Sequence, residues 1–257
     1  MKHALYEKFM NIVTPYLKVQ HSSTLLKDGK ITPEEFVIAG DSLISVCPNW
    51  SWSSAESSKC VDYLPKDKQF LINRRIISQL RATDFNKLTT FETDLPEGWI
   101  QCGEPAKEVD LEDDDQVIDL DEIDIDSIEQ EEPIVEPTVD FRTYDISIVY
   151  DKYYSVPHIY MFGVDSIGQQ LTLEEMYQDI SAEHAEKTVT LEKHPFYDMK
   201  CLSIHPCHHA TVMMDFIERL ENPEKFCAPL YFFLFLKFIH TVIPTIDVST
   251  PTIEIGE

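Results

Sequence analysis

A single thiol stands among three imidazoles in residues 204–210, whose sequence is Ile-His-Pro-Cys-His-His-Ala. An apolar run with helical spacing follows, made up of Val212, Met213, Phe216, Ile217 and Leu220. This spacing predicts a helix over residues 210–220, with Cys207 at or just before its start. Backbone N–H groups, the helix dipole and protonated His208 and His209 would lower the pKa of the Cys207 thiol. Because the thiolate is the reactive form of cysteine, Cys207 is a candidate nucleophile.

Three other interpretations of this stretch remain open from the residues alone. An inert, buried cysteine is the commonest fate of a lone cysteine. A zinc site would draw on Cys201, His205, Cys207, His208 and His209, but the spacing lacks the usual C-x2-4-C and H-x3-5-H pairs. A cysteine hydrolase would need a catalytic Cys–His pair and an oxyanion hole, and no glycine lies near Cys207. A phosphatase loop would need an arginine where Met213 stands.

Composition restricts the class of protein. The 257 residues include 43% hydrophobic ones, enough for one large domain with a buried core. The net charge of −25 argues against binding to nucleic acid. The six cysteines form no C-x2-C pair, so we expect a reducing, cytoplasmic environment without a disulfide framework. The N-terminus lacks the apolar run of a signal peptide, and none is expected.

Acidic residues are concentrated in one part of the chain. Residues 101–140 contain seventeen acidic side chains and one basic side chain, Lys107. Few aromatic residues and charge of a single sign predict disorder there. Aliphatic residues nevertheless recur among the acids over residues 116–128, so this segment is either a linker or a region that folds on a partner.

The periodicity predicts an α+β fold. A capping box at Thr32 with Pro33 behind it predicts a helix to about residue 46. Further helices are expected at residues 173–184 and 228–243, the latter too short to span a bilayer, which needs about 20 apolar residues. Strands are expected at residues 144–150, 158–164 and 188–192, and a hairpin is expected to join residues 60–64 and 69–73.

Nine stretches of the chain match one family in its order. They are residues 205–210, Ile31–Asp41, Cys47–Trp52, Lys68–Leu71, Arg142–Asp145, Tyr150–Tyr154, Met176–Ser181, Lys187–Thr190, and Phe235–Phe238 with Val242–Ile246. On these stretches the chain resembles the autophagy-related protein 3 family. The resemblance leaves out residues 78–140 and the last ten or so residues.

The resemblance implies a fold and an activity. The fold would be of the ubiquitin-conjugating-enzyme type, an antiparallel sheet with flanking helices, built from residues 20–77 and 141–246. Cys207 would carry a ubiquitin-like modifier of the autophagy-related protein 8 family as a thioester and transfer it to phosphatidylethanolamine in autophagosome formation. The modifier would come from an activating enzyme of the autophagy-related protein 7 family, and no cofactor or metal is implied. The alternative is a catalytically silent adaptor that binds partners through its acidic segment.

The resemblance also assigns the flanking segments. Residues 1–19 have an apolar face flanked by lysines, which suits a helix that packs on its own domain or one that lies on a membrane. The resemblance favours the membrane-sensing helix. It makes residues 78–140 a flexible acidic insertion that docks the activating enzyme and the modifier, and it adds an autophagy scaffold conjugate as a further partner of the protein. It places the protein in the cytoplasm, transiently on autophagic membranes. The tail, residues 247–257, differs from the family's aromatic-containing end.

Two further residues receive supporting roles. Ubiquitin-conjugating enzymes have His-Pro-Asn several residues before the cysteine, whereas here His205-Pro206 directly precedes Cys207 and no asparagine follows. Oxyanion stabilisation would come from backbone amides, the Thr188 hydroxyl or His205. Thr188 matches the family threonine that influences transfer, or it is a plain strand residue. His205 either acts in catalysis or orders the loop through a backbone hydrogen bond.

Overall fold

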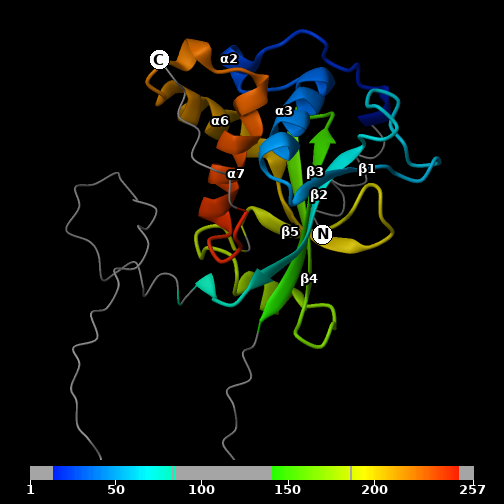
Figure 1. The fold of residues 1–257 in the computed structure, drawn as a ribbon, viewed down its shortest axis with the longest axis vertical. Coiled ribbons are helices and arrows are strands. Elements are labelled where there is room, and N and C mark those ends of the chain that lie inside the picture. The colour runs from blue at the N-terminus through cyan, green and yellow to red at the C-terminus, as the bar shows by residue number, and fades with distance from the viewer. Residues whose placement is uncertain (1–13, 83, 85–140, 186, 249–257) are drawn as a thin grey trace, which may run out of the picture.

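The computed structural model describes residues 14–82, 84, 141–185 and 187–248. A six-stranded sheet runs through this part of the chain in the order β1-β2-β3-β4-β6-β5, and every neighbouring pair is antiparallel (Figure 1). Its strands are β1 (Trp50–Ser53), β2 (Phe70–Ser78), β3 (Arg142–Asp151), β4 (Val156–Val164), β5 (Val189–Lys193) and β6 (Lys200–Ile204). The predicted α+β class with an antiparallel sheet and flanking helices is confirmed.

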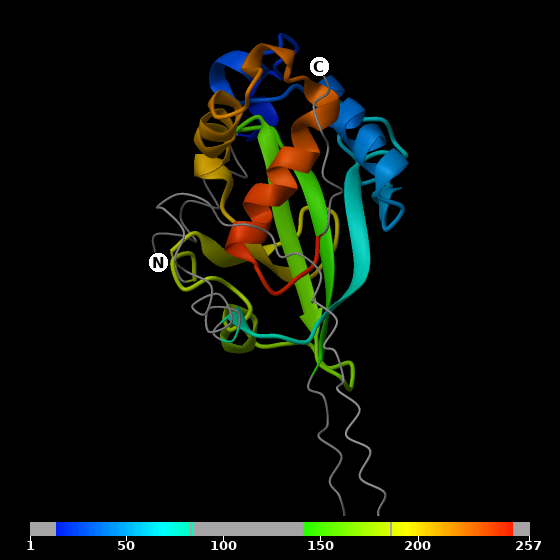
Figure 2. The ribbon, with the colours of Figure 1, turned by 60° about the vertical axis from the view of Figure 1, so that its left-hand side comes forward.

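Helices cover one face of this sheet. They are α2 (Leu25–Asp28), α3 (Pro33–Val46), α5 (Leu173–Tyr177), α6 (His209–Glu218) and α7 (Tyr231–Val242). Short 3-10 turns stand at Thr14–Tyr16, Pro206–His208, Pro223–Lys225 and Ala228–Leu230. Figure 2 shows α7 lying along the strands, with α3 and α6 beside its upper part. Within the described ranges, no helix combines the length and the apolar character that crossing a bilayer requires.

Capping boxes fix the starts of two helices. Thr32 Oγ1 accepts a hydrogen bond from Glu35 N at 3.1 Å, and Glu35 Oε2 accepts one from Thr32 N at 2.8 Å. Thr172 and Glu175 form the same reciprocal pair before α5. Each box satisfies backbone donors that the first helical turn would otherwise leave unpaired. The predicted helix after Thr32 is confirmed.

The core explains the strongly apolar segment near the C-terminus. Eight of the twelve residues of α7 are buried, namely Tyr231, Phe232, Phe233, Phe235, Leu236, Phe238, Ile239 and Val242. They pack with apolar residues of α3 and the sheet in one continuous cluster. Phe36 of α3 meets the Phe232 ring edge-on at 5.3 Å. The expected core helix is therefore confirmed, and a smaller cluster around Phe70 and Phe196 covers the other face of the sheet.

The predicted hairpin between residues 60–64 and 69–73 is wrong. β2 pairs with β1 instead, and residues 60–64 form turns beside it. The buried Gln69 side chain explains why this loop is stable without a strand ladder. Its Oε1 accepts from Val61 N at 2.7 Å, and its Nε2 donates to the carbonyls of Val61, Leu64 and Pro65. One amide side chain thus replaces the backbone partners that a strand would have supplied.

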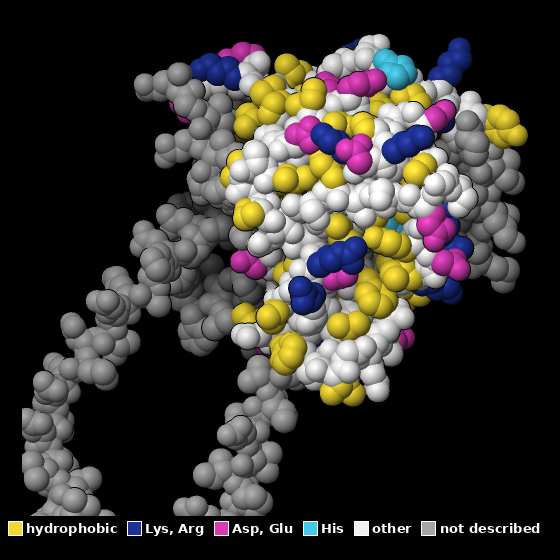
Figure 3. All heavy atoms as spheres, turned by 45° about the vertical axis from the view of Figure 1, so that its right-hand side comes forward, with side chains coloured by type: hydrophobic (Ala, Val, Ile, Leu, Met, Phe, Trp, Pro, Cys, Tyr) yellow, Lys and Arg dark blue, Asp and Glu magenta, His cyan; other side chains and the backbone are white. Residues whose placement is uncertain are grey.

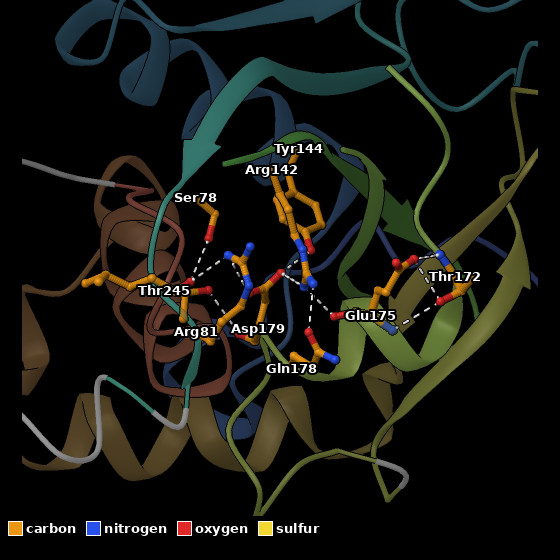
Figure 4. Close-up of polar contacts among 10 residues, drawn as sticks. Ser78, Arg81, Arg142, Tyr144, Thr172, Glu175, Gln178, Asp179 and Thr245 are labelled. Atoms are coloured by element: carbon orange, nitrogen blue, oxygen red, sulfur yellow. Dashed lines mark hydrogen bonds and ion pairs between the residues drawn. The ribbon is translucent and has the colours of Figure 1, made fainter. Parts of the chain in front are cut away.

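The helix predicted for residues 173–184 is also shorter than expected. α5 ends at Tyr177, and two residues later the fully buried Asp179 turns toward the start of β3. Arg142 Nη1 donates to Asp179 Oδ2 at 2.9 Å, and the Tyr144 hydroxyl donates to the same oxygen. Figure 4 shows Arg142, Tyr144 and Arg81 converging on Asp179. A buried carboxylate needs hydrogen-bond partners, and the chain leaves the helix after Tyr177 so that Asp179 can reach Arg142 and Tyr144.

This cluster joins the two ends of the sequence insertion. β2 ends at Ser78, which pairs with Arg142 at the start of β3. Arg81, which follows β2, has Nη1 3.6 Å from Asp179 Oδ1. One carboxylate therefore holds both places where the chain leaves and re-enters the sheet. The predicted acidic insertion otherwise lies outside the described residues, as do residues 1–13 of the predicted amphipathic helix and residues 249–257 of the tail.

Candidate active site

Cys207 lies in the 3-10 turn Pro206–His208, immediately before α6. The turn follows β6, a strand that the sequence analysis did not predict, and Pro206 at its first position is buried. Cys207 itself is exposed, which contradicts the inert, buried cysteine. Of the five cysteines in the described ranges, only Cys207 and Cys227 are exposed. The predicted position at a helix start is confirmed.

His205 orders the turn that carries the thiol. Its Nδ1 accepts a hydrogen bond from Cys207 N at 3.3 Å. Its own backbone N donates to the Thr188 carbonyl at 2.8 Å and so extends the β5–β6 ladder by one bond. Because Nδ1 accepts, the capping ring is the neutral tautomer with its proton on Nε2. This geometry supports the loop-ordering interpretation of His205, and a direct role in catalysis stays a prediction.

Thr188 reaches the site through its backbone, and its hydroxyl has other partners. The Oγ1 atom lies 3.3 Å from His184 Nδ1 and 3.5 Å from the His184 carbonyl. Thr188, His205 and Cys207 thus form one connected group, with His184 behind it. The sequence analysis did not single out His184, and only its spacing of four residues from Thr188 could have suggested the contact. A role for the Thr188 hydroxyl in transfer stays a prediction.

His209 does not supply the positive charge that the sequence analysis expected. It is 1% exposed, and its Nδ1 lies 2.9 Å from the Pro157 carbonyl, to which it donates. Phe235 and Phe238 pack against its ring, and its Nε2 is buried without a hydrogen-bond partner among the described residues. Burial lowers the pKa of His209 to about 3. The ring is therefore neutral near pH 7 and anchors the start of α6 to β4.

The predicted fall in the pKa of the Cys207 thiol is also wrong. Although the residue is exposed, desolvation by the surrounding loop raises the pKa of this thiol. Hydrogen bonds from the backbone amides of Cys207 and His208 act in the opposite direction and lower it, but they do not outweigh the desolvation. The amides thus face the sulfur as the sequence analysis expected, while the cationic contribution of His209 is missing. The thiol is accessible and mostly protonated at neutral pH.

The residues of the hypothetical zinc site do not come together. Cys201 is buried in the cluster around Phe70, and burial raises the pKa of its thiol to about 12. Leu202 and Ile204, its neighbours on β6, face the main core instead. Across the ranges that the structure describes, no group of three or more His, Cys, Asp or Glu side chains is arranged to hold a metal ion.

A groove with a volume of about 760 Å³ opens beside Cys207. One wall is the end of α2 with the turn after it, another is the turn between β3 and β4, and the floor is one side of α6 along its length. The lining residues are Lys27, Asp28, Lys30, Tyr153, Tyr154, Pro206, Cys207, Ala210, Thr211, Met214 and Glu218. The nucleophile therefore stands at the edge of a space that can receive a second reactant.

The tyrosine wall of this groove is fixed by a half-buried acid, Asp151. Asp151 Oδ1 accepts hydrogen bonds from Tyr153 N at 2.9 Å and from Tyr154 N at 2.8 Å. Its other oxygen lies 3.6 Å from His158 Nδ1. Burial alone would raise the pKa of Asp151, but the interactions with His158 and the two backbone amides outweigh it and lower that pKa. The Tyr154 ring meets His205 edge-on at 5.7 Å, so this wall adjoins the active-site turn.

Most of this groove was not predicted from the sequence. The Tyr150–Tyr154 block contributes to the family resemblance, but no pattern in residues 27–30 indicated a site. Gly29 is the signal that could have located the second wall. Its φ of 67° lies in the left-handed region, and a Cβ there would overlap the carbonyl oxygen of Ala210. Only glycine lets the turn after α2 approach α6 this closely.

The charges of the described surface are mixed. On the face in Figure 3, basic and acidic side chains lie next to one another among hydrophobic ones. The strong acidic excess of the sequence, which is concentrated in residues 101–140, is thus not a property of this face.

Comparison with known proteins gives consistent matches over nearly the whole chain. A family model described as autophagocytosis associated protein, active-site domain, matches residues 35–250. Autophagy-related protein 3 of Arabidopsis thaliana is 35% identical, with 96% of this chain and 95% of the relative covered. The protein of that name from Dictyostelium discoideum is 33% identical, with 95% of each chain covered. The Schizosaccharomyces pombe protein is 33% identical, with 97% and 98% covered.

Proposed function

The chain belongs to the autophagy-related protein 3 family, and from this premise we propose that Cys207 carries a ubiquitin-like modifier as a thioester. The modifier is of the autophagy-related protein 8 family, and its final acceptor is the amine of phosphatidylethanolamine. One observation carries the proposal. Cys207 is the exposed thiol at the start of α6, inside the range of the family's active-site domain, and it borders an open groove.

The first step is exchange between two thioesters. The Cys207 thiolate attacks the carbonyl carbon of the modifier's C-terminal glycine, which an activating enzyme of the autophagy-related protein 7 family holds as a thioester. A new C–S bond forms at Cys207, the old one breaks, and the enzyme's thiolate leaves with the electron pair. The bond made and the bond broken are of one kind, so the main requirements are thiolate character and access. The exposure of Cys207 provides access, and the amides of Cys207 and His208 partly offset the desolvation that raises the pKa of its thiol. The thiol gives its proton to water before attack, and the leaving thiolate takes up a proton from water.

The second step is aminolysis. The neutral amine of the lipid attacks the thioester carbonyl, a C–N bond forms, and the C–S bond breaks. The modifier leaves as an amide of the lipid, and the amine's proton passes to the Cys207 thiolate or to water. The intermediate carries an oxyanion, which backbone donors of the turn stabilise. Since desolvation raises the pKa of Cys207, its leaving thiolate is a good acceptor for that proton.

His205 and Thr188 act as positioning residues in this proposal. His205 holds the amide of Cys207, and the Thr188 carbonyl holds His205. Loss of either contact would release the turn that presents the sulfur. Substitution of His205 removes the bond to the Cys207 amide and should lower transfer by displacing the sulfur. Substitution of Thr188 keeps its backbone carbonyl and removes only the hydroxyl, which contacts His184. Neither substitution should impair the charging of the activating enzyme.

The remaining segments supply partners and location. Residues 78–140 dock the activating enzyme and the modifier, and residues 1–19 bring the protein from the cytoplasm to autophagic membranes. An autophagy scaffold conjugate is a further partner. The recurrence of aliphatic residues among the acids of residues 116–128 and the apolar face of residues 1–19 support these roles.

A two-stage assay tests the proposal. The full chain is first charged with the modifier, the activating enzyme and ATP, and charging is read as an adduct that a thiol reagent removes. Charging is then stopped, and vesicles of phosphatidylcholine with or without phosphatidylethanolamine are added. We expect the adduct to form, and to decay into lipid-linked modifier only with phosphatidylethanolamine.

The alternative adaptor gives a different result. A silent adaptor would form no adduct even when the activating enzyme is shown to be charged. A Cys207→Ser variant separates the two again, because an enzyme should trap the modifier as an ester that resists thiol reagents and yields to hydroxide. An adaptor would be unaffected by this substitution.

A further inference from the structure

The groove beside Cys207 is lined by charges of both signs. Lys27 and Lys30 contribute ammonium groups, and Asp28 and Glu218 contribute carboxylates. Over the described residues, neither Lys27 nor Lys30 takes part in an ion pair. Two cations without an anionic partner at the edge of a concave site are available to an anionic ligand, and the nearby carboxylates are available to a cationic one.

The segment that carries these lysines, the end of α2 and the turn after it, is held in place. The Gly29 carbonyl accepts a hydrogen bond from the Tyr231 hydroxyl at 2.9 Å, and that tyrosine is fully buried. Ile31 N donates to the Ser155 carbonyl at 2.9 Å, which joins this turn to the opposite wall of the groove. Both walls are therefore fixed before any ligand arrives, which reduces the entropy lost on binding.

The position of the charges relative to the nucleophile limits the ligand. Gly29 packs against Ala210, and Ala210 lies in the first turn of α6 just after Cys207. A ligand held by the turn after α2 therefore lies beside the sulfur. The acceptor of the proposed second step is a zwitterion, in which a short ethylene link joins a phosphate to an amine. An anion bound by the lysines would bring the linked amine toward the thioester.

We propose that this groove is the acceptor subsite, in which Lys27 and Lys30 bind the phosphate of a phosphoethanolamine headgroup and Asp28 attracts its ammonium group. The assignment rests on the proposed transfer from Cys207. The ammonium group loses its proton to water before attack, and the acyl transfer then balances as described above. The lysines recognise the acceptor and take no part in making or breaking bonds.

Soluble acceptors test this assignment without a membrane. The charged full-length protein is mixed with glycerophosphoethanolamine or with ethanolamine, which has the amine but no phosphate, and the loss of the thioester is followed in time. We compare the wild-type chain with a Lys27→Gln/Lys30→Gln variant and with Lys225→Gln, an exposed lysine outside the groove. Comparing each acceptor between variants cancels the different intrinsic reactivities of the two amines.

We expect the double variant to lose about threefold to tenfold of its discharge rate on glycerophosphoethanolamine, the range for partly exposed charge pairs. Its loss on ethanolamine should be clearly smaller, and Lys225→Gln should match the wild type on both. An equal loss on both acceptors, or no loss on either, would overturn the subsite.

Two further arms separate the possible failures. Inorganic phosphate is added at the acceptor's concentration. The wild type should still discharge onto glycerophosphoethanolamine faster than the double variant does. Loss of this difference would show a general anion site and overturn the headgroup assignment. Failure of the wild type to form the thioester at all would instead refute the proposed function, which the charging step reports separately.

Discussion

Replacing Asp179 with alanine removes the buried carboxylate that holds both ends of the insertion. Asp179 is 0% exposed, and its Oδ2 accepts from Arg142 and Tyr144, which are 5% and 0% exposed. The guanidinium keeps two partners after the change, the Glu175 carbonyl at 2.6 Å and Gln178 Oε1 at 2.7 Å.

The expected cost follows from these contacts. Breaking a buried ion pair by removing one partner costs about 3 to 5 kcal/mol, because a buried charge is left uncompensated. The partners that Arg142 keeps place its share at the lower end. The unpaired Tyr144 hydroxyl adds about 1 kcal/mol or more. We therefore expect Asp179→Ala to lower the free energy of unfolding by about 4 kcal/mol, a large part of the roughly 5 to 15 kcal/mol of an ordinary domain.

Urea unfolding followed by tryptophan fluorescence measures this loss. The matched control is Asp67→Ala, which removes an exposed acid in a turn and should change the free energy of unfolding by less than about 0.5 kcal/mol. A double-mutant cycle with Tyr144→Phe should give a coupling energy of about 1 to 2 kcal/mol between the two side chains. A loss below about 1 kcal/mol for Asp179→Ala would refute the idea that this carboxylate clamps the sheet to the segment after α5.

Three more predictions concern the site and its supports. Gly29→Ala should lower the free energy of unfolding by about 3 kcal/mol in urea, and Gly168→Ala by only about 1 kcal/mol. Both glycines have positive φ, but only a Cβ at Gly29 would meet a neighbouring backbone. Equal losses would contradict this reasoning. In a Cys227→Ala background, alkylation of Cys207 should accelerate about tenfold per pH unit up to roughly pH 8.5, because its thiol pKa is raised; a plateau near neutral pH would disprove that direction. Burial lowers the pKa of His209 to about 3, so the stability it contributes is complete above about pH 6.5 and falls by about 1.4 kcal/mol per pH unit as the pH drops further. A His209→Gln variant, compared by urea unfolding at several pH values, should show a shallower slope, and an unchanged slope would count against the assignment.

Elements with a strong local signal were predictable from the sequence. The capping box at Thr32 predicted the start of α3, and the strongly apolar run before Pro244 predicted α7. The alternation in residues 144–150 likewise predicted β3. Each of these depends on neighbours within a few positions, which is what periodicity reports.

Elements fixed by distant contacts were not predictable. α2 has four residues and shows no period, and it exists because Gly29 packs on α6. α5 ends early because Asp179 binds Arg142, which lies 37 positions away in the chain. The hairpin prediction failed because Gln69 supplies from its side chain the bonds that a strand would have made.

The site shows the same division. The place of Cys207 before a helix followed from residues 204–220 alone, whereas its role as nucleophile stayed one of several interpretations until the family resemblance was considered. The pKa of its thiol did not follow from these residues, because the spacing showed neither the desolvation of the sulfur by its loop nor the burial of the His209 ring under Phe235 and Phe238. The groove brings together residues 27–30, 153–154 and 207–218, and only the fold could show that they meet.

The most direct test of the central claim is the intact mass of the chain after incubation with modifier, activating enzyme and ATP under non-reducing conditions. Wild-type protein and Cys227→Ala, which removes the other exposed thiol among the described residues, should both gain the mass of one modifier less water. Cys207→Ala should gain nothing, and a thiol reagent should reverse the gain in the other two. An adduct that survives in Cys207→Ala, or that disappears in Cys227→Ala, would contradict Cys207 as the carrier.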